Sequence, residues 1–206
     1  MTTLNLEYLN KKLKHKTPNE IIDWALTLSE KRIVSTSFGK YSASMLRLLY
    51  KKDQNINVVW CDTYFNTQET YKYAIDLIHR FNLNIHIYKP LVNKDRIESE
   101  LGFPEVNTPQ HKQFTEIVKL EPFRRALKEH QPEIWFTNIR AKQTTYRDSQ
   151  DILSYSKEGV LKVSPFYYWS DSDLDIYLDD NRLPKNNGYI DLTKALANRE
   201  CGIHFQ

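Results

Sequence analysis

The chain has little cysteine, no long apolar run and no strong excess of charge. Its 206 residues include only two cysteines, Cys61 and Cys201, too few and too far apart for a disulfide framework, so we expect a reducing cytoplasm. No apolar stretch approaches membrane length, and residues 1–5 carry no secretory pattern. The net charge of +3 is too small to favour nucleic-acid binding. These absences favour an ordinary soluble protein with a small-molecule ligand.

Length and composition fit one globular unit. A hydrophobic content of 40% and a charged content of 27% are typical of a folded domain of this size. We expect a single domain over 1–206, with an N-terminal helical segment over about 1–30 and a mobile C-terminal tail over about 185–206. The pI near 8.7 suits a polyanionic small ligand.

Helical and strand-like segments alternate along the chain. A capping box with proline at the first helical position predicts a helix over 17–31. Further helices are expected after Ser42 and over 68–81, 122–129 and 170–181. Strands are expected over 33–34, 56–60, 84–88, 133–137 and 161–163, the last paired with 152–156 in a hairpin. The polar stretch 89–112 is expected to be a long irregular loop. This alternation predicts an α/β fold with a mostly parallel twisted sheet covered by helices.

A loop rich in serine and glycine follows the first expected strand. Residues 35–42 have the sequence STSFGKYS and lead into an apolar helical segment. Strand, short polar loop and helix is the arrangement with which α/β proteins bind phosphate, through loop donors and the helix dipole. Small polar residues that only turn the chain would give the same pattern.

The second notable segment is the run 198–204, NRECGIH, which contains Cys201. A thiol reacts as its thiolate, which nearby cations favour, and Arg199 and His204 flank this cysteine. A terminal tail could swing such a thiol onto a bound substrate. The alternative is a frayed polar tail with an incidental cysteine. Cys61, at the end of an apolar strand, is expected to be a packing residue.

Taken in order, these segments resemble the phosphoadenosine phosphosulfate (PAPS) reductase family, the thioredoxin-dependent enzymes of sulfate assimilation. The loop at 37–39 matches that family's modified pyrophosphatase-type loop, and 199–204 matches its catalytic tail with isoleucine in place of leucine. The remaining matches are Asp62 with Thr63, the stretch 69–71, the stretch 119–122, and the arginine loop with Arg140, Gln143 and Arg147.

The resemblance implies an adenine-nucleotide α-hydrolase-like fold, also called PP-loop pyrophosphatase-like, and a mechanism. Cys201 would attack the sulfuryl sulfur of PAPS, leaving an S-sulfocysteine that a thioredoxin or glutaredoxin thiolate resolves with release of sulfite. Arg199 and His204 would supply cations beside it. The expected substrate-binding residues are Ser35, Ser37, Phe38, Gly39, Asp62, Thr63, Arg140 and Arg147.

The strand order along the chain brings these groups together. Ligands of such sheets bind beyond the carboxyl ends of the strands, and the expected binding residues follow strands one, two and four. Ser35, Ser37 and Gly39 would bind phosphate. Arg140 and Arg147 would donate hydrogen bonds to phosphate or sulfate oxygens. Asp62 is equally consistent with a helix N-cap. Trp135 and Tyr146 are expected to be packing residues.

Related activities remain as alternatives. Adenosine phosphosulfate (APS) reductases resemble the chain but hold an iron–sulfur cluster on four cysteines, so with two we expect no cluster, no metal and no bound cofactor. ATP pyrophosphatases carry a loop from which this chain departs at Phe38 and Tyr41. A cluster-free APS reductase, a sulfur transferase of the ATP pyrophosphatase type and an idle nucleotide-binding module therefore stay open. The expected partners are a sulfonucleotide and a thioredoxin or glutaredoxin, and a homodimer stays open too.

Overall fold

One six-stranded sheet organises the part of the chain that the computed structural model describes, residues 4–194, 200 and 202–205. The strands are β1 Arg32–Thr36, β2 Asn57–Cys61, β3 Ile85–Tyr88, β4 Ile134–Phe136, β5 Leu153–Tyr155 and β6 Leu161–Val163. Their order is β3-β2-β1-β4-β6-β5, and every pairing is parallel except that of β5 with β6. The predicted fold class and the predicted hairpin are confirmed.

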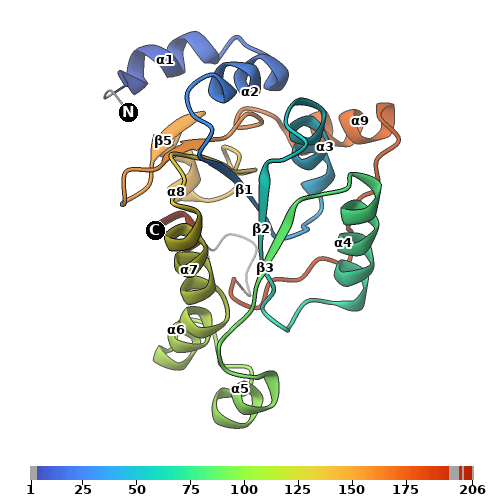
Figure 1. Cartoon of the computed structure of the whole chain (residues 1–206). Helices are drawn as coiled ribbons and strands as arrows, with labels where there is room; N and C mark the ends of the chain where they lie inside the picture. The colour runs from blue at the N-terminus through green and yellow to red at the C-terminus, as the bar shows by residue number, and fades with distance from the viewer. Residues whose placement is uncertain (1–3, 195–199, 201, 206) are drawn as a thin grey trace.

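Helices cover both faces of this sheet. They are α1 Leu6–Leu13, α2 Pro18–Leu26, α3 Ser42–Lys52, α4 Gln68–Arg80, α5 Lys94–Leu101, α6 Pro109–Thr115, α7 Glu121–His130, α8 Thr145–Asp148 and α9 Asp171–Asp180, with the π-helical turn η1 Glu116–Leu120 and the 3₁₀ turn η2 Ile203–Phe205. Figure 1 shows α7 on one side of the strands and α4 on the other.

Alternation along the strands divides the core in two, because successive strand residues point to opposite faces. Val34 and Val58 join the larger cluster with α2, α3, α4 and α9. Ile33, Val59 and Trp135 pack instead with α7.

Local sequence signals place several helix starts correctly. Thr17 begins α2 with a capping box, and Ser170 begins α9 in the same way. Each pairs the capping hydroxyl with a backbone N–H and a carboxylate three residues later with the capping residue's own N–H. The helix α2 ends at Leu26, short of the predicted residue 31, and the hydroxyl of its C-cap Thr27 donates to the Trp24 carbonyl.

The prediction of an irregular loop over 89–112 is wrong. Asn93 caps α5 and Thr108 caps α6, and α6 continues through η1 into α7. The helix α5 buries only Ile97, so its sequence shows no apolar stripe to mark it. The π-helical turn ends where Pro122, which has no N–H to donate, enters α7.

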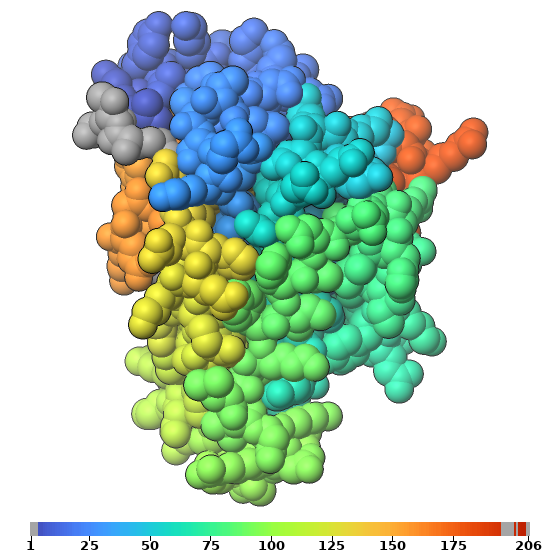
Figure 2. All heavy atoms as spheres, in the orientation of Figure 1, coloured from blue at the N-terminus to red at the C-terminus, as the bar shows by residue number. Residues whose placement is uncertain are grey.

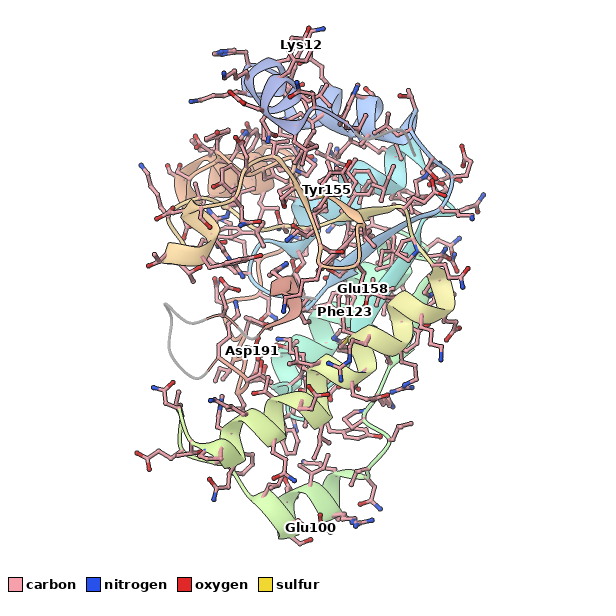
Figure 3. The ribbon with its side chains drawn as sticks, turned by 90° about the vertical axis from the view of Figure 1, so that its left-hand side faces the viewer. Lys12, Glu100, Phe123, Tyr155, Glu158 and Asp191 are labelled. Carbon is pink, nitrogen blue, oxygen red and sulfur yellow. The ribbon has the colours of Figure 1, made fainter. Side chains whose placement is uncertain are left out.

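The molecule is elongated along the direction from α1 to α5. In the space-filling view the first two helices form one end and the segment around α5 the other (Figure 2). Lys12 and Glu100 mark these ends in the side-chain view, with Phe123 and Asp191 between them (Figure 3). Within the described residues, no helix is long and apolar enough to cross a membrane.

Candidate functional site

A cavity of about 320 Å³ opens beyond the carboxyl ends of β1, β2 and β4. Its wall combines the Ser/Gly loop after β1, the segment after β4, the start of the C-terminal segment and the described end of the chain. Five cationic side chains and one carboxylate from the described residues line it: Lys40, Lys119, Arg140, Arg147, Lys194 and Asp191. A cavity with this charge balance suits a polyanionic ligand.

Three of the four loop residues predicted to bind substrate line the cavity, and they are the three predicted to hold phosphate: Ser35, Ser37 and Gly39. Phe38 does not. Its backbone is left-handed, with φ of 50°, and its fully buried ring packs edge-on against Trp60 with centroids 4.9 Å apart. Phe38 therefore shapes the loop from behind, because the turn sends its side chain into the core.

Asn186 holds the loop in this shape, although the sequence did not single it out. Its buried amide donates to the Phe38 carbonyl at 2.8 Å and to the Thr70 hydroxyl at 2.9 Å. Asn138 adds a bond to the Tyr41 carbonyl at 3.2 Å. An amide 148 residues away along the chain thus fixes the loop, which no local pattern could indicate.

The first turn of α3 contributes less than the sequence suggests. The N–H groups of Ser42, Ala43 and Ser44 already donate to the Gly39 carbonyl, the Tyr73 hydroxyl and the Tyr41 carbonyl. The helix dipole still points at the cavity. The direct donors to an anion must therefore come mainly from the loop and from the cationic side chains.

Asp62 is neither a wall residue of the cavity nor a helix cap. Its buried carboxylate accepts from the Tyr71 hydroxyl at 2.7 Å, the Asn66 amide at 3.1 Å and the Tyr64 N–H at 3.1 Å. Thr67 caps α4 instead. Asp62 therefore organises the turn after β2, and Thr63 beside it reaches the cavity wall.

Both predicted arginines lie at the cavity, and both are paired with carboxylates. Arg140 meets Asp171 at 2.6 Å, and Arg147 meets Glu200 at 2.6 Å. Gln143 joins the two arginines, because its side-chain oxygen accepts from the Arg140 N–H and from the Arg147 guanidinium. A ligand that uses these arginines must share them with the protein's own carboxylates.

Ile203 and His204 lie on the cavity wall, and the His204 ring stacks on Trp135 with ring centroids 5.5 Å apart and planes 11° apart. Burial lowers the pKa of His204 well below its usual 6.5, and the positive charges of Arg147 and Lys162 lower it further. This burial favours the neutral ring, which argues against His204 as the cation that the sequence predicts. Cys201 and Arg199 lie outside the described residues.

Three further residues of the site were not predicted to act there. Trp135, expected only to pack, is fully buried against Phe123 and also donates its indole N–H to the Ser35 hydroxyl at 2.8 Å. Lys119 forms a buried ion pair with Asp191 at 2.5 Å. Cys61 ends β2 as expected and also contributes to the cavity wall.

The ion pair of Lys119 and Asp191 joins η1 to the segment that leads into the tail. Burial is the largest single effect and acts to raise the pKa of Asp191, but the charge and hydrogen bond of Lys119, with the Thr193 hydroxyl and the Lys194 charge, together lower that pKa to about 2. Thr193 donates to the same carboxylate through its hydroxyl at 2.6 Å and its N–H at 3.1 Å. Both partners of this ion pair line the cavity.

Comparison with known sequences gives a consistent result. The family described as phosphoadenosine phosphosulfate reductase domain matches residues 31–190. A phosphoadenosine 5'-phosphosulfate reductase from Vibrio cholerae is 36% identical over 226 residues, covering 98% of this chain and 89% of its own. A reductase of the same name from Synechocystis is 32% identical over 212 residues, covering 99% and 84%.

Comparison with solved structures bears on the fold. The PAPS reductase of Candida auris, in a phosphate complex, has a TM-score of 0.77 at 21% identity and covers 90% of this chain and 91% of its own. The FMN adenylyltransferase of Candida glabrata, with FAD and inorganic pyrophosphate, has a TM-score of 0.57 at 12% identity and covers 83% and 57%. The predicted nucleotide α-hydrolase-like architecture is confirmed.

Proposed function

The chain belongs to the phosphoadenosine phosphosulfate reductase family, and we propose on this basis that it reduces PAPS to sulfite and releases adenosine 3',5'-bisphosphate. The observation that carries the proposal is the cavity lined both by the Ser/Gly loop and by Ile203 and His204 of the C-terminal turn η2. Attack of a thiol on a sulfonucleotide requires a loop that binds phosphate and, close to it, the chain segment that carries the cysteine.

The reaction is two displacements at sulfur. The Cys201 thiolate attacks the sulfuryl sulfur, the bond from sulfur to the phosphate oxygen breaks, and the bisphosphate leaves with the electron pair. A donor thiolate then attacks the Cys201 sulfur and expels sulfite, forming a mixed disulfide. The donor's second thiol releases Cys201, so the dithiol supplies the two electrons.

The described residues support this chemistry by binding and by charge. Ser35, Ser37 and Gly39 lie where a phosphate group would be held. Lys40 and Lys194 line the same cavity, and their charge offsets the repulsion between the anionic substrate and an approaching thiolate. The several cations also favour PAPS over APS, since PAPS carries an additional phosphate. Arg199 and Cys201 keep their proposed roles on the sequence alone.

A thioredoxin or glutaredoxin is the proposed electron donor, and no resident cofactor is needed. A nucleophilic thiol and a dithiol donor both need a reducing compartment, so the cytoplasm is the proposed location.

The test is sulfite release from PAPS and from APS, each with and without reduced thioredoxin. We expect sulfite from PAPS at a rate at least tenfold above that from APS, and only when a dithiol donor is present. Equal or faster turnover of APS would make the chain a cluster-free APS reductase. Conversion of ATP to AMP and pyrophosphate, without sulfite from either substrate, would replace the proposal by a sulfur transferase.

A further inference from the structure

Lys162 is a charged residue at a position that otherwise suits an apolar one. It lies in the middle of β6 with 1% of its surface exposed, between Leu161 and Val163, which are fully buried. Burying a lysine is costly because its ammonium group loses hydration. Burial lowers the pKa of Lys162 to about 8 despite the nearby negative charge of Glu200. Such a residue is a candidate for a specific task.

The contacts of Lys162 show what it holds. Its Nζ lies 3.2 Å from the backbone carbonyl of His204 and 3.4 Å from the hydroxyl of Tyr146. The same Tyr146 hydroxyl donates to the His204 carbonyl at 2.8 Å. The two side chains thus offer donors to one carbonyl oxygen, which can accept two hydrogen bonds. No carboxylate of the described residues lies within ion-pair distance of Lys162.

The pairing of β6 with β4 places the Lys162 donor next to His204. Lys162 is the register partner of Trp135 across β6 and β4, and Trp135 carries the stacked ring of His204. One residue of the C-terminal segment is therefore held at its carbonyl by Lys162 and Tyr146 and at its ring by Trp135. Glu200, nearer the start of that segment, is held separately by Arg147 and by the Thr144 hydroxyl at 2.7 Å.

We propose that Lys162 is a positioning residue which, with Tyr146, docks the C-terminal segment on the cavity wall by binding the His204 carbonyl. The effect of this docking on catalysis rests on the proposed function, whereas the docking itself does not depend on it. Without the two donors the carbonyl has no such anchor, the ring leaves Trp135, and the C-terminal segment keeps only its separate attachment at Glu200.

The test compares Lys162→Met and Tyr146→Phe with the wild-type protein. Methionine keeps an unbranched side chain and removes the buried charge, so we expect an unchanged or higher melting temperature. Hydrogen exchange, followed by mass spectrometry, should accelerate at least fivefold in the peptide covering 200–206 and stay unchanged in the strands. With PAPS and thioredoxin, kcat should fall about tenfold or more, while the Kd for adenosine 3',5'-bisphosphate stays within twofold.

Lys72→Met is the matched control, because Lys72 is exposed on α4. It should change neither exchange nor turnover. Unchanged exchange of the C-terminal peptide in both variants would overturn the proposal, as would a general rise over the whole chain or a large loss of nucleotide affinity. Tyr146→Phe keeps the aromatic ring, so it gives the answer if Lys162→Met does not fold. If wild-type protein releases no sulfite but the exchange results hold, only the proposed function fails.

Discussion

Glu200 and Arg147 form an ion pair with Oε1 and Nε 2.6 Å apart, and less than a tenth of either side chain is exposed. The arginine that the sequence assigns to the substrate is therefore bound to the tail in this state. Removing one partner of a buried pair leaves the other charge uncompensated. Substrate binding and tail docking therefore draw on the same guanidinium group.

This shared use predicts opposite effects on two measurements in Glu200→Gln. The variant frees the Arg147 charge, and a charge-assisted bond to a phosphate contributes roughly 1.5–3 kcal/mol. The affinity for adenosine 3',5'-bisphosphate should rise about tenfold, while sulfite formation falls because the tail is less firmly held. Isothermal titration and a sulfite assay check the two effects. Unchanged affinity would mean that Arg147 does not reach the ligand.

Cys201 is expected to be the nucleophile. Incubation with PAPS and no reductant should add a sulfonate mass to the peptide that contains Cys201, as measured by mass spectrometry. Cys201→Ser should bind nucleotide but release no sulfite. The peptide that contains Cys61, the second cysteine of the chain, is the internal control and should gain no sulfonate mass. Full activity of the Cys201 variant would contradict the assignment.

Trp135→Phe separates packing from hydrogen bonding. Phenylalanine keeps an aromatic ring beneath His204 and in the core but removes the N–H that donates to the Ser35 hydroxyl. A neutral hydrogen bond contributes about 1 kcal/mol, so KM for PAPS should rise roughly fivefold with a smaller change in kcat. Initial-rate kinetics measure the split. A fall in kcat alone would show that the ring, and not the N–H, matters.

The pair of Lys119 and Asp191 predicts an acid-sensitive contribution to stability. The folded pKa of Asp191 is about 2 and its reference value is 3.8, so the pair stabilises the fold above pH 4 by about 2 kcal/mol. Asp191 becomes protonated as the pH falls from 4 to 2, so this contribution to the free energy of unfolding is lost over that range.

Urea unfolding between pH 2 and 6 should show this loss in the wild-type protein. Asp191→Asn should have lower stability at pH 6 and a flatter profile below pH 4, because the titrating carboxylate is gone. Parallel profiles for the two proteins would show that the ion pair does not contribute.

The purified protein is expected to be colourless and free of iron, even when prepared without oxygen. Two cysteines cannot supply the four thiolates of an iron–sulfur cluster of the kind that APS reductases carry. Visible absorption together with iron and sulfide analysis checks this. Stoichiometric iron and sulfide would overturn the expectation.

Part of the structure could be predicted because the signals are local. The capping box at Thr17, the start of α4 and the β5–β6 hairpin are each written in a few neighbouring residues, and each is confirmed. The helix α5 was missed for the same reason, since Ile97 is its only buried residue and leaves no periodic stripe. A helix without a periodic apolar pattern cannot be predicted from a short stretch of sequence.

The sequence by itself determined most elements of the α/β fold, the loop that opens on the cavity and the cysteine proposed as nucleophile. Only the tertiary structure decided how the charged residues around the loop and the tail are paired and buried. Its contacts pair Arg147 with Glu200, lower the pKa of the buried His204 and place the Lys162 ammonium against the His204 carbonyl. The physical reason is that residue type and spacing are local, whereas burial and ion pairing depend on which distant segments meet. A histidine near a cysteine in the sequence is expected to be a cation, whereas burial in the fold lowers its pKa.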